Sequence, residues 1–187
     1  MSKFLAVTPT ELDGVLILEP KRFGDPRGWF TESYNAARMK EAGIDLTFIQ
    51  DNQSFSADIG TIRGLHFQTP PQAQDKLVRV LAGAIYDVAV DLRNGSPTYG
   101  KHVGVDLTAE NGRQLLVPKG FAHGFVTRVP DTMVFYKVTA PYAPECDEGL
   151  AFDDPDLGID WGIAAEKAFL SDKDARQSAF ASFETPF

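Results

Sequence analysis

Apolar and polar residues alternate in short segments along most of the chain, and turn-forming residues separate the segments. Successive side chains of a β-strand point to opposite faces, so this alternation predicts strands. The segments are rich in Val, Ile, Phe and Tyr, which favour extended structure. We predict about ten strands, over residues 14–18, 29–34, 46–55, 61–67, 76–82, 84–92, 102–107, 113–117, 124–129 and 132–139.

Turn residues occur between these segments at the spacing of an all-β sandwich or barrel. Examples are Gly24-Asp25-Pro26, Asn111-Gly112 and Pro130-Asp131. Long helices between the strands, which an α/β fold needs, are missing. We find no repeat, low-complexity segment or linker, so we expect residues 1–187 to form a single all-β domain.

Two short helical patterns interrupt the strands. Asn35 is a candidate N-cap for a helix that extends to Glu41, and Gly43 is a candidate C-terminal stop. A second, C-terminal helix is predicted from Ser171 onward, where apolar residues recur at helical intervals and Ser171 and Asp174 form a weak capping box.

Composition excludes several classes of protein. Twenty-six acidic against 18 basic residues give a net charge of −8, the wrong sign for binding a nucleic-acid backbone. Cys146 is the single cysteine, which excludes an intrachain disulfide framework and a thiolate metal cluster. No apolar run is long enough for a signal peptide or a membrane span, so we expect a cytoplasmic protein that does not bind membranes.

Ionisable residues within the predicted strands are candidates for chemistry. Lys76 shares a strand face with Val78, so its amine is expected to project into an enclosed space. Asp87 shares a face with Ile85 and Ala89, opposite the face of Tyr86, Val88 and Val90. Such residues are also found at exposed rims or in paired core positions, and this reading stays open for each one taken alone. Together they favour a polar-lined cavity.

The strand over residues 61–67 contains two further candidates, His66 and Arg63. Strict alternation places His66 on the face of Ile62 and turns Arg63 the other way, unless Gly64 makes a β-bulge.

The histidines raise the question of a metal site. The chain has His66, His102 and His123, but no His-x-His pair of the kind that barrel metal sites commonly use. We therefore expect no metal, and histidine available for proton transfer near neutral pH. Cys146 has acidic neighbours, which disfavour a reactive thiolate.

Seven motifs together resemble the dTDP-4-dehydrorhamnose 3,5-epimerase family in order and spacing, from about residue 13 to residue 174. The resemblance implies a cupin-like jelly-roll barrel, usually a homodimer, that needs no cofactor and acts on a dTDP-4-keto-6-deoxy sugar. The motifs are FGDPRGWFTE (23–32), QDNQS (50–54), RGLHFQ (63–68), KLVR (76–79), GAIYDVAVDLR (83–93), PKGFAHGF (118–125) and YK (136–137).

The resemblance also implies roles for individual residues. The general base falls on His66, the general acid on Tyr136 and the carboxylate that supports the base on Asp174. The further active-site positions are Lys76, Asp87 and His123. The substrate-binding positions are Arg27, Glu32, Gln50, Asn52, Arg63, Asp147 and Lys173.

The chain departs from the family pattern at Ala140, where an Asp is usual, at Asp147, where a Glu is usual, and over residues 162–169, which lack a common proline. Several alternatives remain: a 3-epimerase or 5-epimerase of another deoxysugar, a non-catalytic sugar-binding cupin, and a metal-dependent cupin. Asp174 could also be only a helix cap, and Tyr136 only a packed strand residue.

Overall fold

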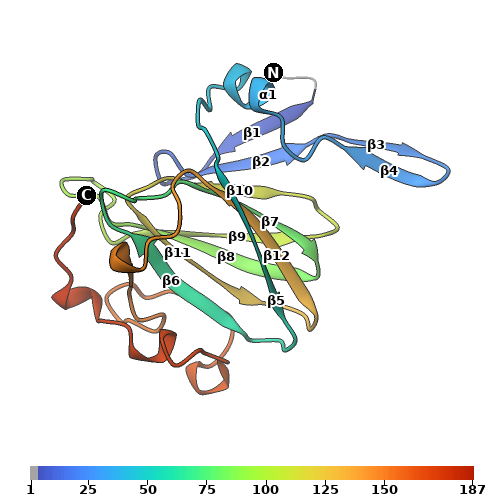
Figure 1. The fold of residues 1–187 in the computed structure, drawn as a ribbon. Coiled ribbons are helices and arrows are strands. Elements are labelled where there is room, and N and C mark those ends of the chain that lie inside the picture. Colours follow the sequence, from blue (N-terminus) through green and yellow to red (C-terminus); the bar gives the residue numbers. More distant parts are fainter. Residues whose placement is uncertain (1–3) are drawn as a thin grey trace.

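The computed structural model describes residues 4–187, which fold around two facing β-sheets (Figure 1). The strands are β1 (Leu5–Pro9), β2 (Leu16–Pro20), β3 (Arg22–Asp25), β4 (Gly28–Thr31), β5 (Gln50–Ser56), β6 (Ile62–Gln68), β7 (Lys76–Ala82), β8 (Ala84–Asp91), β9 (His102–Thr108), β10 (Gln114–Val117), β11 (Phe121–Thr127), β12 (Thr132–Val138) and β13 (Asp147–Gly149). The helical elements are the α-helix α1 (Ala36–Glu41) and the 3₁₀ turns η1 (Pro144–Cys146), η2 (Ala165–Lys167), η3 (Asp174–Arg176) and η4 (Phe180–Ser182).

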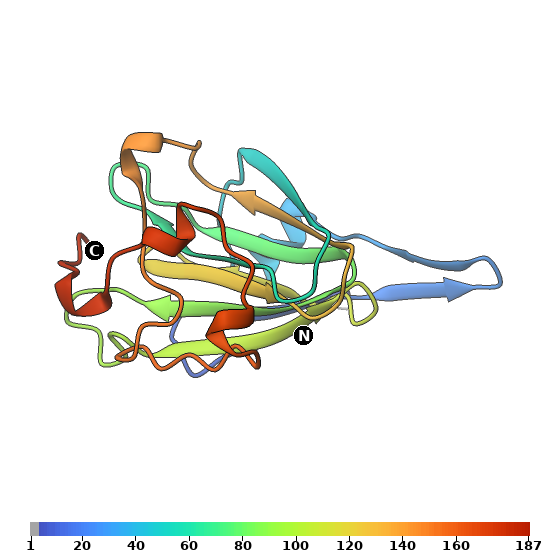
Figure 2. The same ribbon diagram turned by 90° about the horizontal axis from the view of Figure 1, so that it is seen from below.

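The strands pair antiparallel in two main sheets. One sheet has the order β1-β2-β10-β7-β12-β5, and the other has the order β13-β6-β11-β8-β9. The arms β3 and β4 form a separate hairpin that projects away from the body (Figures 1 and 2). The all-β prediction is therefore confirmed.

Each main sheet is covered by apolar contacts on both faces. The interior between the sheets is filled by residues of several strands, such as Val78, Ile85 and Val134. The outer face of the six-stranded sheet packs against Met39 of α1. The outer face of the five-stranded sheet is covered by the C-terminal segment, in which Phe183 lies 5.3 Å from Phe67 between ring centroids.

Each of the ten predicted segments overlaps an observed strand, and β7 has the predicted bounds. The prediction missed β1, β3 and β13. The motif Gly24-Asp25-Pro26 predicts a turn. In the structure, Gly24 and Asp25 belong to β3, and the chain reverses direction between Asp25 and Gly28. The polar strand β13 has only three residues and is defined by its pairing with β6.

The helix beginning after Asn35 is confirmed, because the Asn35 side chain accepts a hydrogen bond from the Arg38 amide at 3.2 Å. The C-terminal helix takes the form of two separate 3₁₀ turns, η3 and η4. Backbone groups on either side of η3 form hydrogen bonds with other segments of the chain. Phe169 bonds to Gly60 and Ile62, and Ser178 bonds to Ala151. Within residues 4–187, no helix is long and apolar enough to cross a membrane.

The predicted strand faces are observed for Lys76 and Asp87, which lie on the interior face with Val78 and Ile85. The simple alternation is wrong for His66. Between the pairs His66–His123 and Arg63–Phe125, β6 advances by three residues and β11 by two. This bulge places His66 on the same face as Arg63, and Ile62 packs on the outer side.

The bulge requires glycine at position 64. Gly64 has φ +125°, and a Cβ there would lie 2.6 Å from the Gly124 Cα and 2.7 Å from the His123 carbonyl oxygen. Both neighbours are backbone atoms of the adjacent strand, so β6 and β11 could not stay paired in this register.

We expect Gly64→Ala to destabilise the protein by about 3 kcal/mol or more, because it combines backbone strain with a steric clash. Urea unfolding monitored by circular dichroism measures the change. The matched control is Gly95→Ala, where φ is also positive at +74° but no atom lies within 4 Å of the added Cβ. Its cost should be about 1 kcal/mol. Equal losses for the two variants would contradict the close-contact argument.

Candidate active site

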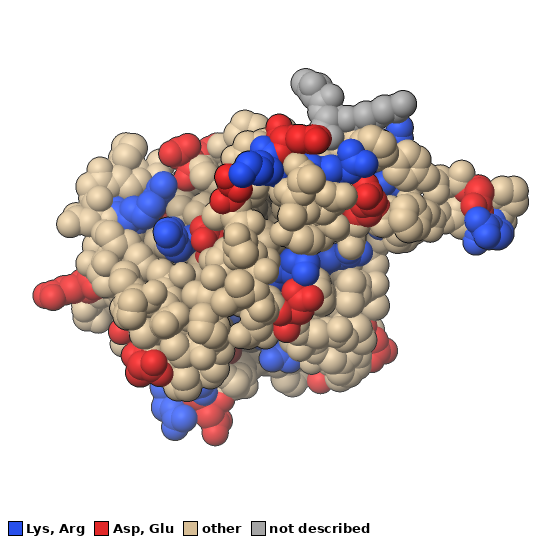
Figure 3. Space-filling model, turned by 45° about the horizontal axis from the view of Figure 1, so that its top comes forward, with Lys and Arg blue, Asp and Glu red and all other residues tan. Residues whose placement is uncertain are grey.

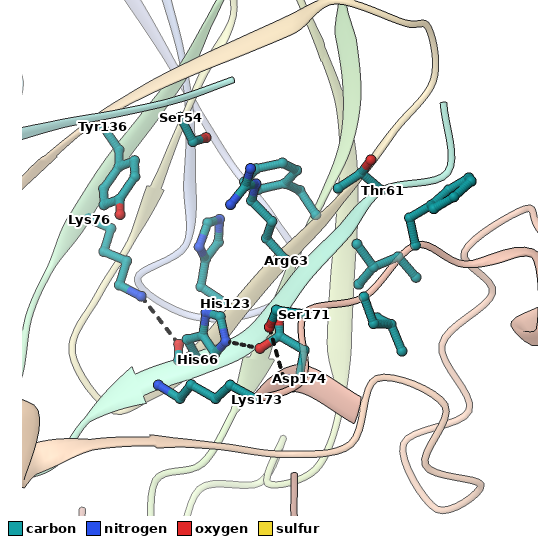
Figure 4. A pocket seen from close by; sticks show the side chains of 14 residues that line it. Ser54, Thr61, Arg63, His66, Lys76, His123, Tyr136, Ser171, Lys173 and Asp174 are labelled. Carbon is teal, nitrogen blue, oxygen red and sulfur yellow. Dashed lines mark hydrogen bonds and ion pairs between the residues drawn. The ribbon is translucent and has the colours of Figure 1, made fainter. Parts of the chain in front are cut away.

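Two adjoining cavities of ≈ 430 and ≈ 340 Å³ open between the sheets and the C-terminal segment. His66, Lys76, Tyr136 and Lys173 line both cavities, so the cavities form one site. Figure 4 shows the larger cavity. The side chains come from the strands β5, β6, β7, β11, β12 and β13, from loops, and from the segment around η3. Residues distant in the sequence therefore converge on one space.

The His66 ring is held by a carboxylate. Its Nε2 lies 2.5 Å from Oδ1 of Asp174, which is 5% exposed. Burial raises the pKa of Asp174, but hydrogen bonds from His66, Ser171 and the Gly64 amide outweigh it, so the net pKa is lowered. Asp174 therefore stays ionised, and His66 Nε2 carries the proton that it donates. The lone pair is then on Nδ1. The Ser171 hydroxyl accepts the Asp174 amide proton at 3.1 Å, so Ser171 caps the turn that leads into η3. The Asp174 carboxylate does not act as a cap and bonds to His66 instead.

Lys76 brings an ammonium group to the same space. Its Nζ donates to the His66 carbonyl oxygen at 3.2 Å. Burial lowers the pKa of Lys76 to about 8, although the charges of Asp147 and Asp87 partly oppose this shift. Lys76 is therefore a cation at neutral pH with little solvent around it, which strengthens its electrostatic effect on a bound anion.

A second histidine–carboxylate pair lies beside the first. His123 is the cross-strand partner of His66, and its Nε2 lies 2.8 Å from Oδ1 of Asp87, which is fully buried. The two histidines are thus held by different carboxylates. Within residues 4–187, no group of three or more His, Cys, Asp or Glu side chains is placed to hold a metal ion.

Tyr136 and Arg63 complete the wall of the larger cavity. Burial raises the pKa of Tyr136, so its hydroxyl stays protonated at neutral pH. The Arg63 guanidinium donates from Nε to Ser56 Oγ at 3.2 Å and from one Nη to the Phe55 carbonyl oxygen at 2.8 Å. These bonds to β5 fix the guanidinium plane at the cavity.

Polar residues gather in the second cavity. Gln50 donates to Asn52 at 2.8 Å, and both project from β5. Across from them, Lys173 Nζ lies 2.5 Å from Oδ2 of Asp147, which also accepts the Tyr142 hydroxyl proton at 2.9 Å. This half of the site offers amide, carboxylate, ammonium and aromatic groups.

Arg27, Glu32 and Asp87 line neither cavity, unlike the other residues that the resemblance implies. Asp87 is buried behind the site and contacts it through His123. Arg27 is near the tip of the projecting hairpin, where its exposed guanidinium pairs with Asp25 at 2.7 Å. Glu32 accepts a hydrogen bond from Arg38 at 2.7 Å at the start of α1. Within one chain, these two residues are not brought to the site.

Several residues that line the larger cavity are not among the predicted site residues. Ser54 could have been found from its spacing, because it follows Gln50 and Asn52 on alternate positions of one strand. The others carry no local signal, because the bulge and the fold of the C-terminal segment bring them in. They are Thr61, Phe125, Phe169 and Leu170. Ser171, predicted only as a helix cap, lines the cavity as well.

Residues 9–182 match the family described as dTDP-4-dehydrorhamnose 3,5-epimerase. A member from Sinorhizobium fredii is 51% identical over 173 residues, which cover 92% of this chain and 88% of that protein. The crystal structure of a dTDP-6-deoxy-D-glucose-3,5-epimerase from Legionella pneumophila, in complex with dTDP-4-keto-L-rhamnose, has a TM-score of 0.91 and 46% identity. That match covers 96% of this chain and 95% of the other.

A 3′-monoepimerase from Streptomyces bikiniensis, in complex with dTDP-quinovose, shares the fold at a lower identity. Its TM-score is 0.85 and its identity is 31%, and the match covers 92% of this chain and 87% of that one. The fold is thus common to double and single epimerases, whereas sequence identity is higher to the double epimerases. The extent of the family match and these identities establish that the chain belongs to the dTDP-4-dehydrorhamnose 3,5-epimerase family.

Proposed function

We propose that this chain converts dTDP-4-dehydro-6-deoxy-D-glucose into dTDP-4-dehydro-L-rhamnose by inverting C3 and C5, without a metal or another cofactor. One observation carries the proposal: His66, held by Asp174, shares a cavity with the cation Lys76 and the protonated phenol Tyr136. These groups supply a base, a charge that stabilises an enolate and an acid.

In the proposed reaction, Nδ1 of His66 removes the proton from a carbon next to the C4 ketone. The electron pair of the broken C–H bond moves to the ketone oxygen, and the resulting enolate is stabilised by Lys76 and by His123. Asp174 stabilises the imidazolium that forms. Tyr136 then delivers its hydroxyl proton to the opposite face of the carbon. Exchange with water restores both side chains.

The nucleotide part of the substrate is assigned to the remaining polar groups. Arg63 and Lys173 supply positive charge for the diphosphate, which counters the net negative charge of the chain. Gln50, Asn52 and Asp147 supply hydrogen-bonding groups in the second cavity.

We further propose a cytoplasmic homodimer in which the β3–β4 hairpin of one subunit covers the other. Trp29 and Phe30 on the hairpin are 54% and 67% exposed. An isolated two-stranded hairpin is only marginally stable in water, and its exposed aromatic side chains favour a protein partner. Phe55 and Leu81 are exposed on the outer face of the six-stranded sheet and offer apolar contact surface. Such an exchange would bring Arg27 to the partner's site.

Deuterium labelling tests the reaction. In heavy water with dTDP-4-keto-6-deoxyglucose, the enzyme should incorporate deuterium at both C3 and C5, because each inversion exchanges a proton with solvent. Mass spectrometry and NMR of the product locate the label. His66→Ala should reduce the rate of incorporation at both carbons by about 10² to 10⁴-fold. Label at one carbon only would indicate a single epimerase, and no label would contradict the epimerase function.

The pH dependence tests Lys76. We expect kcat/KM to fall as pH rises through about 8, because Lys76 then loses its charge. Lys76→Met should lower kcat by about 10² to 10³-fold, the usual loss for an electrostatic group at a developing oxyanion. The exposed Lys101→Met serves as the control, with an unchanged profile. If the residual activity of Lys76→Met still falls as pH rises through about 8, the fall in kcat/KM does not come from Lys76.

The same group makes a prediction about stability. The pKa of Lys76 is 10.5 in the unfolded chain and about 8 in the folded one, so the unfolded chain binds more protons between these values. The contribution of Lys76 to stability should therefore rise with pH across this range. At pH 7 the buried charge costs the folded state roughly 3 kcal/mol, and Lys76→Met should raise the free energy of unfolding there. Urea unfolding at pH 7 and pH 10 checks the sign.

Light scattering and complementation test the dimer. The solution mass should be about twice 20.5 kDa. Arg27→Ala and His66→Ala should each be weakly active, yet their mixture, after subunit exchange, should regain about a quarter of wild-type activity, because one site of each mixed dimer is intact. No recovery in a mixture shown to contain mixed dimers would contradict the exchange of Arg27 between subunits.

A further inference from the structure

The inner face of β5 carries a row of polar side chains. Gln50, Asn52, Ser54 and Ser56 occupy alternate positions and therefore face the same side. Gln50 bonds to Asn52, and Ser56 accepts a hydrogen bond from Arg63. The Ser54 hydroxyl differs from its neighbours. Its oxygen is buried and has no hydrogen-bond partner anywhere in the part of the chain that the structure describes.

An unpartnered buried hydroxyl is unfavourable for folding. A polar group removed from water without a new hydrogen bond costs about 1 to 3 kcal/mol. Alanine at this position would avoid that cost and would leave the strand intact. Ser54 is therefore better explained by a hydrogen bond that forms only when the cavity is filled.

The surroundings of Ser54 indicate which group fills it. Ser54 lies on the wall of the larger cavity, with Tyr136 on one side and Arg63 on the other (Figure 4). The bonds of Arg63 to Ser56 and to the Phe55 carbonyl oxygen use Nε and one Nη, so the guanidinium is already fixed before a ligand arrives. A fixed cation beside a free hydroxyl donor suits an anionic oxygen.

We propose that Ser54 binds the diphosphate of the substrate, donating its hydroxyl proton to a phosphoryl oxygen that also contacts Arg63. Ser54 lines the cavity, and its hydroxyl can change rotamer about χ1. This inference rests on the proposed function, because that function supplies the nucleoside diphosphate.

Binding of dTDP alone tests the inference, because dTDP has the diphosphate but no sugar. Isothermal titration calorimetry should show that Ser54→Ala weakens dTDP binding by about tenfold, the effect of one hydrogen bond to a charged group. KM for the nucleotide sugar should rise by a similar factor. In the absence of ligand, the variant should melt a few degrees higher than the wild type, because it lacks the unpartnered hydroxyl.

Ser182→Ala is the matched control, since its hydroxyl bonds to the Ala179 carbonyl oxygen outside the cavity. It should leave dTDP binding unchanged. A Ser54→Ala variant that binds dTDP like the wild type would overturn the inference, and so would weaker binding together with a lower melting temperature. The outcome is separable from the proposed reaction, because a failure of that reaction would appear as absent deuterium label in the wild type.

Discussion

Charge held inside an apolar barrel is the constraint on which this structure depends. Lys76, Asp87 and Asp174 are each at least nine-tenths buried, and each interacts with a histidine through a backbone carbonyl oxygen or a ring nitrogen. Removing charges from water is unfavourable, and it also makes every electrostatic interaction within the cavity stronger. The two large sheets and their apolar interior supply the stability that offsets this cost. The site therefore needs the whole sandwich and not only the loops near it.

The bulge in β6 determines how the charged groups meet. It turns Arg63 and His66 to the same face, and the pairing of β6 with β11 sets His66 beside His123. The C-terminal segment then crosses the outer face of the same sheet, where Phe183 and its neighbours anchor it, and brings Asp174 to His66. Sheet register and the packing of the C-terminal segment are thus both required to build the histidine–carboxylate pair.

These two features also explain what could be predicted from the sequence. Period-two alternation predicted the strands, the enclosed position of Lys76 and the common face of Asp87 and Ile85, because these depend on local backbone geometry. The face of His66 depends on a bulge that the sequence does not determine, because strict alternation fails where Gly64 approaches the neighbouring strand. The apolar residues of the C-terminal segment pack on the five-stranded sheet. Their spacing resembles that of a helix, although the segment forms two separate 3₁₀ turns. Arg27 and Glu32 do not lie at the cavity of their own chain, so the fold of a single chain cannot account for their predicted role.

The geometry of the substrate explains why one set of residues can serve two carbons. C3 and C5 both flank C4, so the enolates formed from either carbon place their negative charge on the same ketone oxygen. A cation that stabilises one enolate therefore stabilises the other without moving. Only the base and the acid must reach two carbons, and that depends on how the sugar is held in the cavity.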